Sequence, residues 1–127
     1  MKSKLDELAK KITQQCIGSE CTQPFSPECD VYKVLGKIYL MSFELVGIGV
    51  LNLKVDPIDG EMLRDLYPFI RTGYHMNKRH WISVYEHEKM DVNFIEELIL
   101  SSYSLVVSKM NKTDQTKIAI MQAALAK

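Results

Sequence analysis

The first hydrophobic residues of the chain follow a helical spacing. Leu5, Leu8, Ile12 and Cys16 lie three or four residues apart, and Lys and Glu residues occupy positions between them. Hydrophobic side chains at this spacing lie on one side of a helix. The pattern therefore predicts an amphipathic helix that covers a core and ends near Gly18.

The next segment, residues 21–30, has no regular hydrophobic pattern. It contains two prolines and small polar residues in the order CTQPFSPECD. Such residues interrupt regular structure, so we expect an irregular loop. Phe25 is the aromatic residue of this segment, and we expect it to pack the loop onto the body of the protein.

Strand-forming residues follow from position 31. The run VYKVLGKIYLM divides into two β-rich halves at Gly36, a residue that can adopt the positive φ of a tight hairpin turn. Residues 45–55, LVGIGVLNLKV, predict a third and central strand, in which Gly47 and Gly49 indicate a bulge or a close approach of backbone. Residues 80–85 predict the last strand.

A helix is predicted after the third strand. Asp56 and Pro57 are typical of a helix start, because a carboxylate can cap free amides and proline needs no amide partner there. Pro68 is expected to end this helix. The side chains expected on its buried side are Met62, Leu63 and Leu66.

Two more helices are predicted at the end of the chain. Asp91 is expected to cap a long helix with a wide hydrophobic side. This side consists of Phe94, Ile95, Leu98, Ile99, Leu105 and Val106, while Glu96 and Glu97 face water. The final helix begins at Thr113 and places Ile118, Met121 and Leu125 on one side, where they pack on the domain or dock onto a partner.

The order of these elements, α-β-β-β-α-β-α-α, predicts the fold class. It favours an α+β fold in which an antiparallel sheet carries helices on one face. With 127 residues the chain has the usual size of one domain, so residues 1–127 are expected to form a single domain.

Charge is balanced over the chain. Lys plus Arg and Asp plus Glu number 16 each, which gives a net charge of 0. A neutral chain has no overall positive field, so nucleic-acid binding would have to come from a local patch. The charged start MKSKLDELAKK excludes a secretory signal, and the longest apolar stretch, near residues 45–53, is too short to cross a bilayer.

The pattern of chemically reactive residues does not favour an enzyme or a metal site. His75, His80 and His87 match no common zinc-ligand spacing, and the three cysteines lack a C-x-x-C pair. We expect the cysteines to be reduced and the protein to be cytoplasmic. Ser83 has no nucleophile motif around it, and GIG at residues 47–49 lacks the third glycine of a dinucleotide site. We therefore expect no enzymatic activity, cofactor or metal.

The stretch GYHMNKRHWISVYEHE, residues 73–88, concentrates histidine, basic and aromatic residues. Arg71, Lys78 and Arg79 supply three positive charges with no acidic residue before Tyr85. Such a local group of cations can bind phosphates although the whole chain is neutral.

Aromatic residues lie next to these cations in the sequence. Tyr74, Trp81 and Tyr85 could stack on bases or sandwich a planar ligand. The alternative is structural, because Trp81, Ser83 and Tyr85 share one face of an alternating strand and a lone tryptophan often anchors a core. The residue pattern leaves both interpretations open.

The chain resembles the MmcQ/YjbR-like family of small bacterial proteins in two runs, YHMNKRHWISV and FIEELILSSYSLVVSKM. The family's His-x-Asn-Lys-x-His-Trp segment is matched by His75, Asn77, Lys78, His80 and Trp81. Its later helix is matched by Ser102, Tyr103, Val106 and Val107, with Met110 at the usual apolar position. The resemblance extends over about residues 25–110 and includes the hairpin YKVLGKIYLM, whereas residues 111–127 are less typical.

This resemblance implies a fold similar to frataxin-like and secretion-chaperone-like domains, in a double-wing arrangement predicted from its shape to bind DNA. Our hypothesis is a cytosolic, non-enzymatic binding protein with DNA as its candidate ligand. Lys78 and Arg79 would meet phosphates, Asn77 and His75 would form hydrogen bonds, and Trp81 would stack or brace the loop. The full set of candidate residues is Arg71, His75, Asn77, Lys78, Arg79, His80 and Trp81.

Two other hypotheses stay open. A protein-interaction or chaperone-like module would dock a partner, or a second copy, through an open sheet face or the C-terminal helix. An enzyme or binder for a small anionic ligand would use His75 and His80. Burial distinguishes these hypotheses from a structural role, because both imidazoles and Trp81 would then pack against the helix over residues 91–110.

Overall fold

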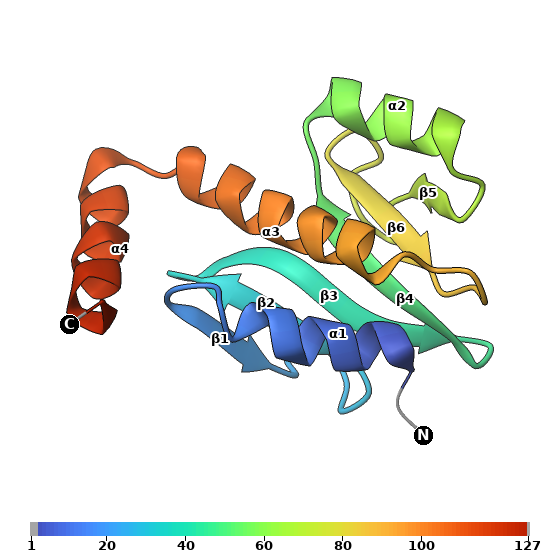
Figure 1. The fold of residues 1–127 in the computed structure, drawn as a ribbon, viewed down its shortest axis with the longest axis horizontal. Coiled ribbons are helices and arrows are strands. Elements are labelled where there is room, and N and C mark those ends of the chain that lie inside the picture. Colours follow the sequence, from blue (N-terminus) through green and yellow to red (C-terminus); the bar gives the residue numbers. More distant parts are fainter. Residues whose placement is uncertain (1–2, 127) are drawn as a thin grey trace.

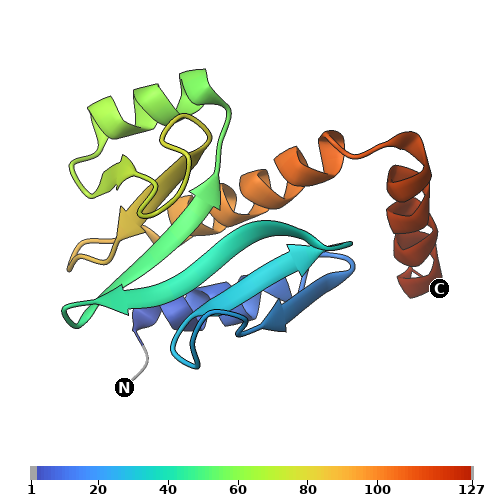
Figure 2. The same ribbon diagram turned by 180° about the vertical axis from the view of Figure 1, so that it is seen from behind.

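The computed structural model describes residues 3–126, which form an antiparallel sheet with helices packed on it (Figures 1 and 2). Within these residues the strands are β1 (Ser19–Thr22), β2 (Asp30–Val34), β3 (Lys37–Leu45), β4 (Ile48–Lys54), β5 (Ile70–Thr72) and β6 (Trp81–Tyr85). The helices are α1 (Lys4–Thr13), α2 (Pro57–Leu66), α3 (Val92–Ser108) and α4 (Lys112–Leu125). The strand order is β1-β2-β3-β4-β6-β5, so β4 is central as predicted.

The predicted α+β class is confirmed, but β1 and β5 were not predicted. Both are short strands at the two edges of the sheet. β1 has the polar sequence SECT and lies mostly exposed, and β5 has only three residues. An edge strand pairs on one side only and is partly exposed to water, so it can be short and polar. The sequence of such a strand therefore lacks the hydrophobic pattern from which a strand is predicted. Residues 21–30 were predicted as a loop, but only residues 23–29 lie outside the strands, because Thr22 ends β1 and Asp30 begins β2.

Two hairpin turns set the register of the central strands. Leu35 and Gly36 join β2 to β3 with φ angles of 47° and 80°. Val46 and Gly47 join β3 to β4 with φ angles of 50° and 77°. Positive φ at both central residues is the signature of a type I′ turn, whose twist matches that of paired strands. Residues 45–55 were predicted as one strand with a bulge or a close backbone approach at its glycines. For Gly47 this prediction is wrong, because Gly47 lies in the turn between β3 and β4.

The hydrophobic core lies between one face of the sheet and the helices α1 and α3. Leu5 and Ile12 of α1, and Ile95 and Ile99 of α3, are at most 1% exposed. They pack with hydrophobic residues that alternate along the central strands, among them Leu51, Leu53, Ile82 and Val84. The predicted amphipathic character of both helices is confirmed. Ser102 of α3 is also buried, and its hydroxyl accepts from the Lys54 amide and donates to the Tyr39 carbonyl.

Of the three side chains expected on the buried side of α2, Leu63 packs against the core, whereas Met62 and Leu66 do not. Met62 is 56% exposed and Leu66 is 65% exposed, while Leu63 is half-buried. α2 lies over β5 and the neighbouring strand β6, where Gly60 approaches Val55 so closely that an added Cβ would lie 2.8 Å from a Val55 methyl carbon. The helix therefore turns Gly60 and Leu63 towards the sheet, and Met62 and Leu66 away from it. Its N-cap Asp56 makes no side-chain capping hydrogen bond, contrary to expectation.

α4 lies beyond the end of α3, on the side of the molecule that carries β1 and β2 (Figure 1), and its Met121 side chain lies against Gly18. It begins one residue before the predicted Thr113 and is capped by the Asn111 side chain. Ile118 is 6% exposed, but Leu125 is 72% exposed, so the predicted hydrophobic side is only partly covered. None of the helices in residues 3–126 is long and apolar enough to span a membrane.

Candidate nucleic-acid interface

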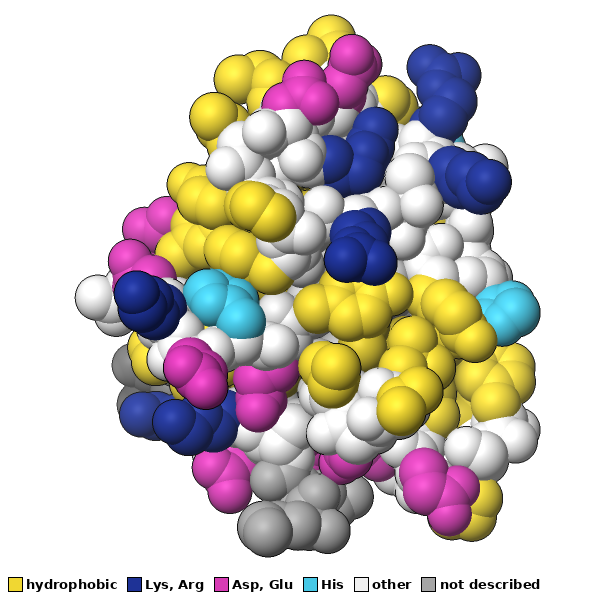
Figure 3. All heavy atoms as spheres, turned by 90° about the vertical axis from the view of Figure 1, so that its right-hand side faces the viewer, with side chains coloured by type: hydrophobic (Ala, Val, Ile, Leu, Met, Phe, Trp, Pro, Cys, Tyr) yellow, Lys and Arg dark blue, Asp and Glu magenta, His cyan; other side chains and the backbone are white. Residues whose placement is uncertain are grey.

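The sheet face opposite α1 and α3 carries the functional candidates, and we call it the open face (Figure 2). Strand pairing aligns its side chains in rows across the sheet. The middle row contains Met41, Asn52, Ser83 and Arg71. The row on one side of it contains Phe43, Val50 and Tyr85. The row on the other side contains Lys54 and Trp81. In the right-hand half of Figure 3, a group of hydrophobic side chains has Lys and Arg side chains above it and a histidine at its edge.

Two cations lie over aromatic rings on the open face. The Nζ atom of Lys54 lies 5.9 Å from the centroid of the Trp81 ring. The Cζ atom of Arg71 lies 5.3 Å from the centroid of the Tyr85 ring. An ammonium or guanidinium over a ring is attracted by the negative face of the ring and keeps its charge for a ligand. Among the described residues, neither cation has an ion-pair partner.

Residues 73–76 cross the open face and are fastened to it by a buried polar network. The Tyr74 amide donates to Ser83 Oγ over 2.8 Å, and Asn52 Nδ2 donates to the Tyr74 carbonyl over 3.0 Å. Ser83 Oγ in turn donates to Asn52 Oδ1. Asn52 is 1% exposed and Ser83 is 0% exposed. Because buried polar groups are costly when unpaired, this network holds the loop in one place.

A tight turn follows the crossing loop and presents three basic side chains to solvent. Asn77 Oδ1 accepts from the amides of Arg79 and His80, over 2.9 Å and 3.2 Å. Side-chain bonds of this kind stabilise turns. Lys78, Arg79 and His80 are exposed. Asn77 therefore has a structural role through its carbonyl oxygen, whereas its amide nitrogen remains able to donate.

A hydrophobic hollow of about 350 Å³ lies beside the crossing loop, and we call it the aromatic cleft. Four rings line it, from Phe25, Phe43, Tyr74 and His75. Three sulfur-containing side chains and one amide complete the lining: Cys29, Met41, Met76 and Asn52. Phe25 is 68% exposed, so the expectation that it packs the loop onto the body is wrong.

The thiol that lines the aromatic cleft is not an activated nucleophile. Burial, and then the charge of Asp30, raises the pKa of the Cys29 thiol. Burial also raises the pKa of Cys16 and Cys21. A reactive cysteine needs a lowered pKa, because the thiolate is the nucleophile. Groups of three or more His, Cys, Asp or Glu that could hold a metal ion are absent from residues 3–126.

The predicted site residues fall into three groups in the structure. Arg71 and Trp81 lie on the open face, and His75 lines the aromatic cleft. Lys78, Arg79 and His80 lie in the exposed turn that leads into β6. Trp81 is 8% exposed, and His75 and His80 are exposed. A purely structural role would require His75, His80 and Trp81 to pack against α3. They do not, because Trp81 lies on the opposite face of the sheet and both histidines are exposed.

Sequence reasoning missed Lys54 and Phe43 as members of this surface. Lys54 is 27 residues from Trp81 in the chain, and only the pairing of β4 with β6 places it opposite that residue. Phe43 reaches the crossing loop in the same way, with its ring centroid 5.9 Å from that of Tyr74. The alternation of β3 and β4 indicates one shared face, but the sequence does not tell which segments cover it.

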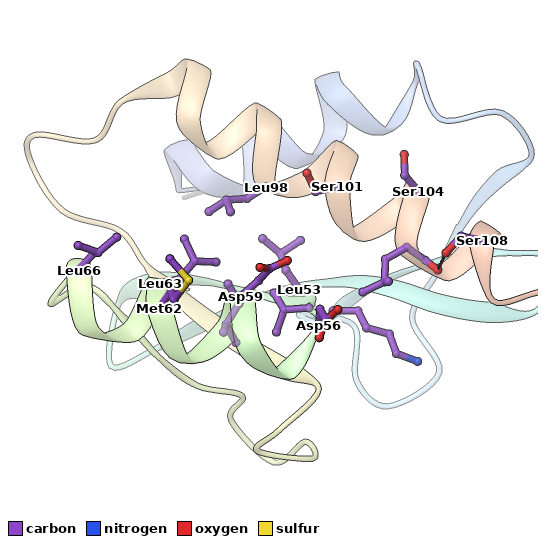
Figure 4. Close-up of a pocket in the computed structure, with 14 residues that line it drawn as sticks. Leu53, Asp56, Asp59, Met62, Leu63, Leu66, Leu98, Ser101, Ser104 and Ser108 are labelled. Atoms are coloured by element: carbon purple, nitrogen blue, oxygen red, sulfur yellow. Dashed lines mark hydrogen bonds between the residues drawn. The ribbon is translucent and has the colours of Figure 1, made fainter.

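A second concavity of about 610 Å³ lies between α2 and α3 (Figure 4). Leu63 and Leu66 of α2 and Leu98 of α3 line it, with Ser101, Ser104 and Ser108 along α3. Asp56 and Asp59 also line this groove. Carboxylates repel phosphate, so the groove is less suited to nucleic acid than the open face.

Comparison with known proteins finds relatives over nearly the whole chain. Residues 16–105 match the family model described as YjbR. An uncharacterized protein YbdF from Escherichia coli O157:H7 is 43% identical over 117 residues, which cover 92% of this chain and 96% of the relative.

Two crystal structures are similar in fold. That of Deinococcus radiodurans protein DR2400, described with a DUF419 domain, has a TM-score of 0.80 and 32% identity, covering 94% of this chain and 89% of the other. That of a Pseudomonas syringae protein has a TM-score of 0.66 and 27% identity, covering 75% of this chain and 92% of the other.

Proposed function

We propose that this chain, which belongs to the YjbR family, is a non-enzymatic protein that binds single-stranded DNA through the open face of its sheet. The observation that carries the proposal is the pairing of cations with rings on that face. Lys54 lies over Trp81 and Arg71 lies over Tyr85. Trp81 is buried and braces the Lys54 ammonium, whereas the exposed Tyr74 ring of the crossing loop is available for stacking. Proteins that bind single strands combine cations along the backbone path with rings on which bases stack.

A single strand fits this surface better than a duplex. The chain has a net charge of 0, and non-specific binding to duplex DNA normally requires many phosphate contacts from a strongly basic surface. The open face offers Lys54 and Arg71, and the adjoining turn adds Lys78 and Arg79. A few cations suffice when stacking on rings contributes the rest of the binding energy.

The chemistry of the other candidate groups supports binding without catalysis. Ser83 Oγ lies in a buried network with Asn52 and the Tyr74 amide, and is 0% exposed. It is therefore not available to attack a substrate. The raised pKa of the Cys29 thiol argues in the same direction. We also propose that the protein works in the cytoplasm, where exposed thiols such as that of Cys21 stay reduced.

The proposal is tested by the salt dependence of binding. A fluorescein-labelled oligothymidylate of about 12 nucleotides is titrated with protein at several salt concentrations, and anisotropy reports the bound fraction. Each phosphate contact contributes about 0.7 to the slope of log K against log salt for a single strand. The double variant Lys54→Ala with Arg71→Ala should therefore reduce the magnitude of the slope by about 1.4.

A matched control removes two cations far from the open face. Lys11 of α1 and Lys112 of α4 are exposed, and Lys11→Ala with Lys112→Ala changes the net charge by the same amount. This control should keep the slope of the unmodified protein. Equal slopes for all three proteins would show that the open face does not contact phosphates, and absence of any binding would refute the function.

A second candidate function is protein interaction through α4. The helix lies at one end of the molecule (Figure 2), and on its outer side Ile120 is 64% exposed and Leu125 is 72% exposed. Exposed hydrophobic side chains of this size favour a contact with a partner or a second copy. Light scattering of the full chain and of a variant that ends at Met110 tests self-association. The mass per particle should fall by more than the deleted residues if α4 joins two copies.

A further inference from the structure

The loop residue Tyr74, which lines the aromatic cleft, is held in place by hydrogen bonds to the sheet. Tyr74 is fixed at its backbone amide by Ser83 and at its carbonyl by Asn52, both of which are buried. Its ring lies 5.9 Å from the Phe43 ring, with an angle of 34° between the two planes. The two rings are thus held near each other before any ligand arrives, which lowers the entropy cost of binding.

His75 adopts a conformation that non-glycine residues avoid. Its φ is +58°, in the left-handed region. Its ring meets the Tyr74 ring edge to face, with centroids 4.2 Å apart and an angle of 79°. Leu35 and Val46 adopt the same conformation in the hairpin turns, so the positive φ fixes the path of the loop and does not by itself indicate a ligand. Here the strained conformation brings an exposed imidazole to the aromatic cleft.

The lining of the aromatic cleft suits the flat face of a ligand more than its polar edge. The amide of Asn52 is already used on both sides, by Ser83 and by Tyr74. Cys29, Met41 and Met76 supply sulfur atoms, which make favourable contacts with aromatic rings. A ligand held here gains stacking and dispersion energy and few hydrogen bonds.

The charges near the aromatic cleft favour an anion attached to that ligand. Asn52, Ser83 and Arg71 lie opposite one another in one row across β4, β6 and β5. Adjacent strands are about 4.8 Å apart, which places the Cα atom of Arg71 roughly 10 Å from that of Asn52. The guanidinium can therefore hold a phosphate beside a ring that occupies the cleft.

We propose that the aromatic cleft receives one unpaired base of the bound strand, with a neighbouring phosphate directed to Arg71. The proposal rests on the function proposed above and specifies how the strand lies on the open face. Because the cleft recognises the face of the base and not its edge, all four bases enter with similar affinity. An unpaired base is required, since a base inside a duplex cannot leave its stack without cost.

The experiment compares an intact strand with a strand that lacks bases. Oligothymidylate of about 12 nucleotides and a counterpart with consecutive abasic positions at its centre carry the same phosphates. Both are titrated with the unmodified protein, with Phe43→Leu and with Tyr74→Leu. Phe69→Leu is the control, because Phe69 is a partly buried ring that packs against the core and His87, away from the cleft.

The expected result is a loss of affinity that depends on the bases. The unmodified protein should bind the abasic strand roughly 5- to 100-fold more weakly than the intact strand, as for loss of stacking on one base. Phe43→Leu and Tyr74→Leu should bind the intact strand correspondingly weakly and discriminate little between the two strands. Phe69→Leu should discriminate as the unmodified protein does. Circular dichroism and thermal unfolding of each variant identify any loss of folding.

The outcomes separate the two proposals. If both strands bind the unmodified protein equally and Lys54→Ala with Arg71→Ala weakens binding, the strand is bound through phosphates and the base-binding cleft is refuted. A strong preference for one base over the other three in homopolymer titrations would refute recognition through the face alone. If neither strand binds, the proposed function itself is wrong.

Discussion

Ser83 and Asn52 lie opposite each other on β6 and β4, and the hydroxyl of Ser83 donates to Asn52 Oδ1 over 2.5 Å. The same hydroxyl accepts from the Tyr74 amide, so one serine connects the sheet to the loop that crosses it. The sheet therefore fixes the position of Tyr74, because two residues on neighbouring strands hold the backbone of the loop.

Ser83→Ala should destabilise the protein and loosen the crossing loop. The substitution leaves the Tyr74 amide and Asn52 Oδ1 without a partner in a buried place, which costs about 1–3 kcal/mol. Urea unfolding measures the free energy, and hydrogen exchange at the Tyr74 amide measures the loosening. Ser104→Ala on the exposed side of α3 is the control and should change little. Unchanged exchange at Tyr74 in Ser83→Ala would contradict the role of the serine.

Ser102→Ala should also destabilise the protein, because it breaks the bridge between α3 and the sheet. Ser102 accepts from the Lys54 amide over 2.8 Å and donates to the Tyr39 carbonyl over 2.6 Å. Its loss leaves the Lys54 amide unpaired and should lower the unfolding free energy by about 1–3 kcal/mol. The adjacent exposed Ser101→Ala provides the comparison on the same helix. Similar denaturation midpoints for the two variants would show that the bridge from α3 to the sheet contributes little.

Val46→Asn should stabilise the protein. Val46 is fully exposed, and it has a φ of 50°, which is unfavourable for a β-branched residue. Asparagine before glycine is the preferred pair of a type I′ turn, so the gain should be about 1 kcal/mol. Thermal or chemical unfolding measures it. Val46→Thr keeps the β-branch and should give no gain, and a gain from both would point to a cause other than the turn.

Stability should fall at alkaline pH because of buried tyrosines. Burial raises the pKa of Tyr39 far above its ordinary value of about 10, and burial likewise raises that of Tyr32. Above pH about 10 these groups ionise in the unfolded chain while they stay protonated in the folded chain. Each group then reduces the unfolding free energy by up to about 1.4 kcal/mol per pH unit, whereas its contribution is fully present below pH about 10.

The variant Tyr39→Phe isolates one of these tyrosines. It loses the hydrogen bond between Tyr39 and Ser19, so it is less stable at every pH. The informative quantity is therefore the slope of the unfolding free energy against pH, which should be shallower in the variant above pH about 10. Tyr74→Phe on the exposed loop serves as the control. A slope as steep as that of the unmodified protein would mean that Tyr39 does not contribute.

The sequence by itself determined the α+β class, the core helices and the hairpin at Gly36. These features depend on local rules, since the period of hydrophobic residues identifies α1 and α3 and a glycine with positive φ identifies the turn. It also identified the basic and aromatic stretch and the family, because both lie in consecutive residues. The edge strands were not predicted, because β1 is polar and β5 has only three residues. The exposed side of α2 was not predicted either, because it carries the hydrophobic residues Met62 and Leu66.

Only the tertiary structure decided how the candidate site is composed. Lys54 and Phe43 belong to β4 and β3, and strand pairing brings them to Trp81 and Tyr74. Alternation along a strand states that two residues share a face, but not which distant segment crosses that face. The crossing loop is placed by Ser83 and Asn52, 31 residues apart in the chain. Contacts over such separations form only when the whole sheet is assembled, which is why the residues alone do not reveal them.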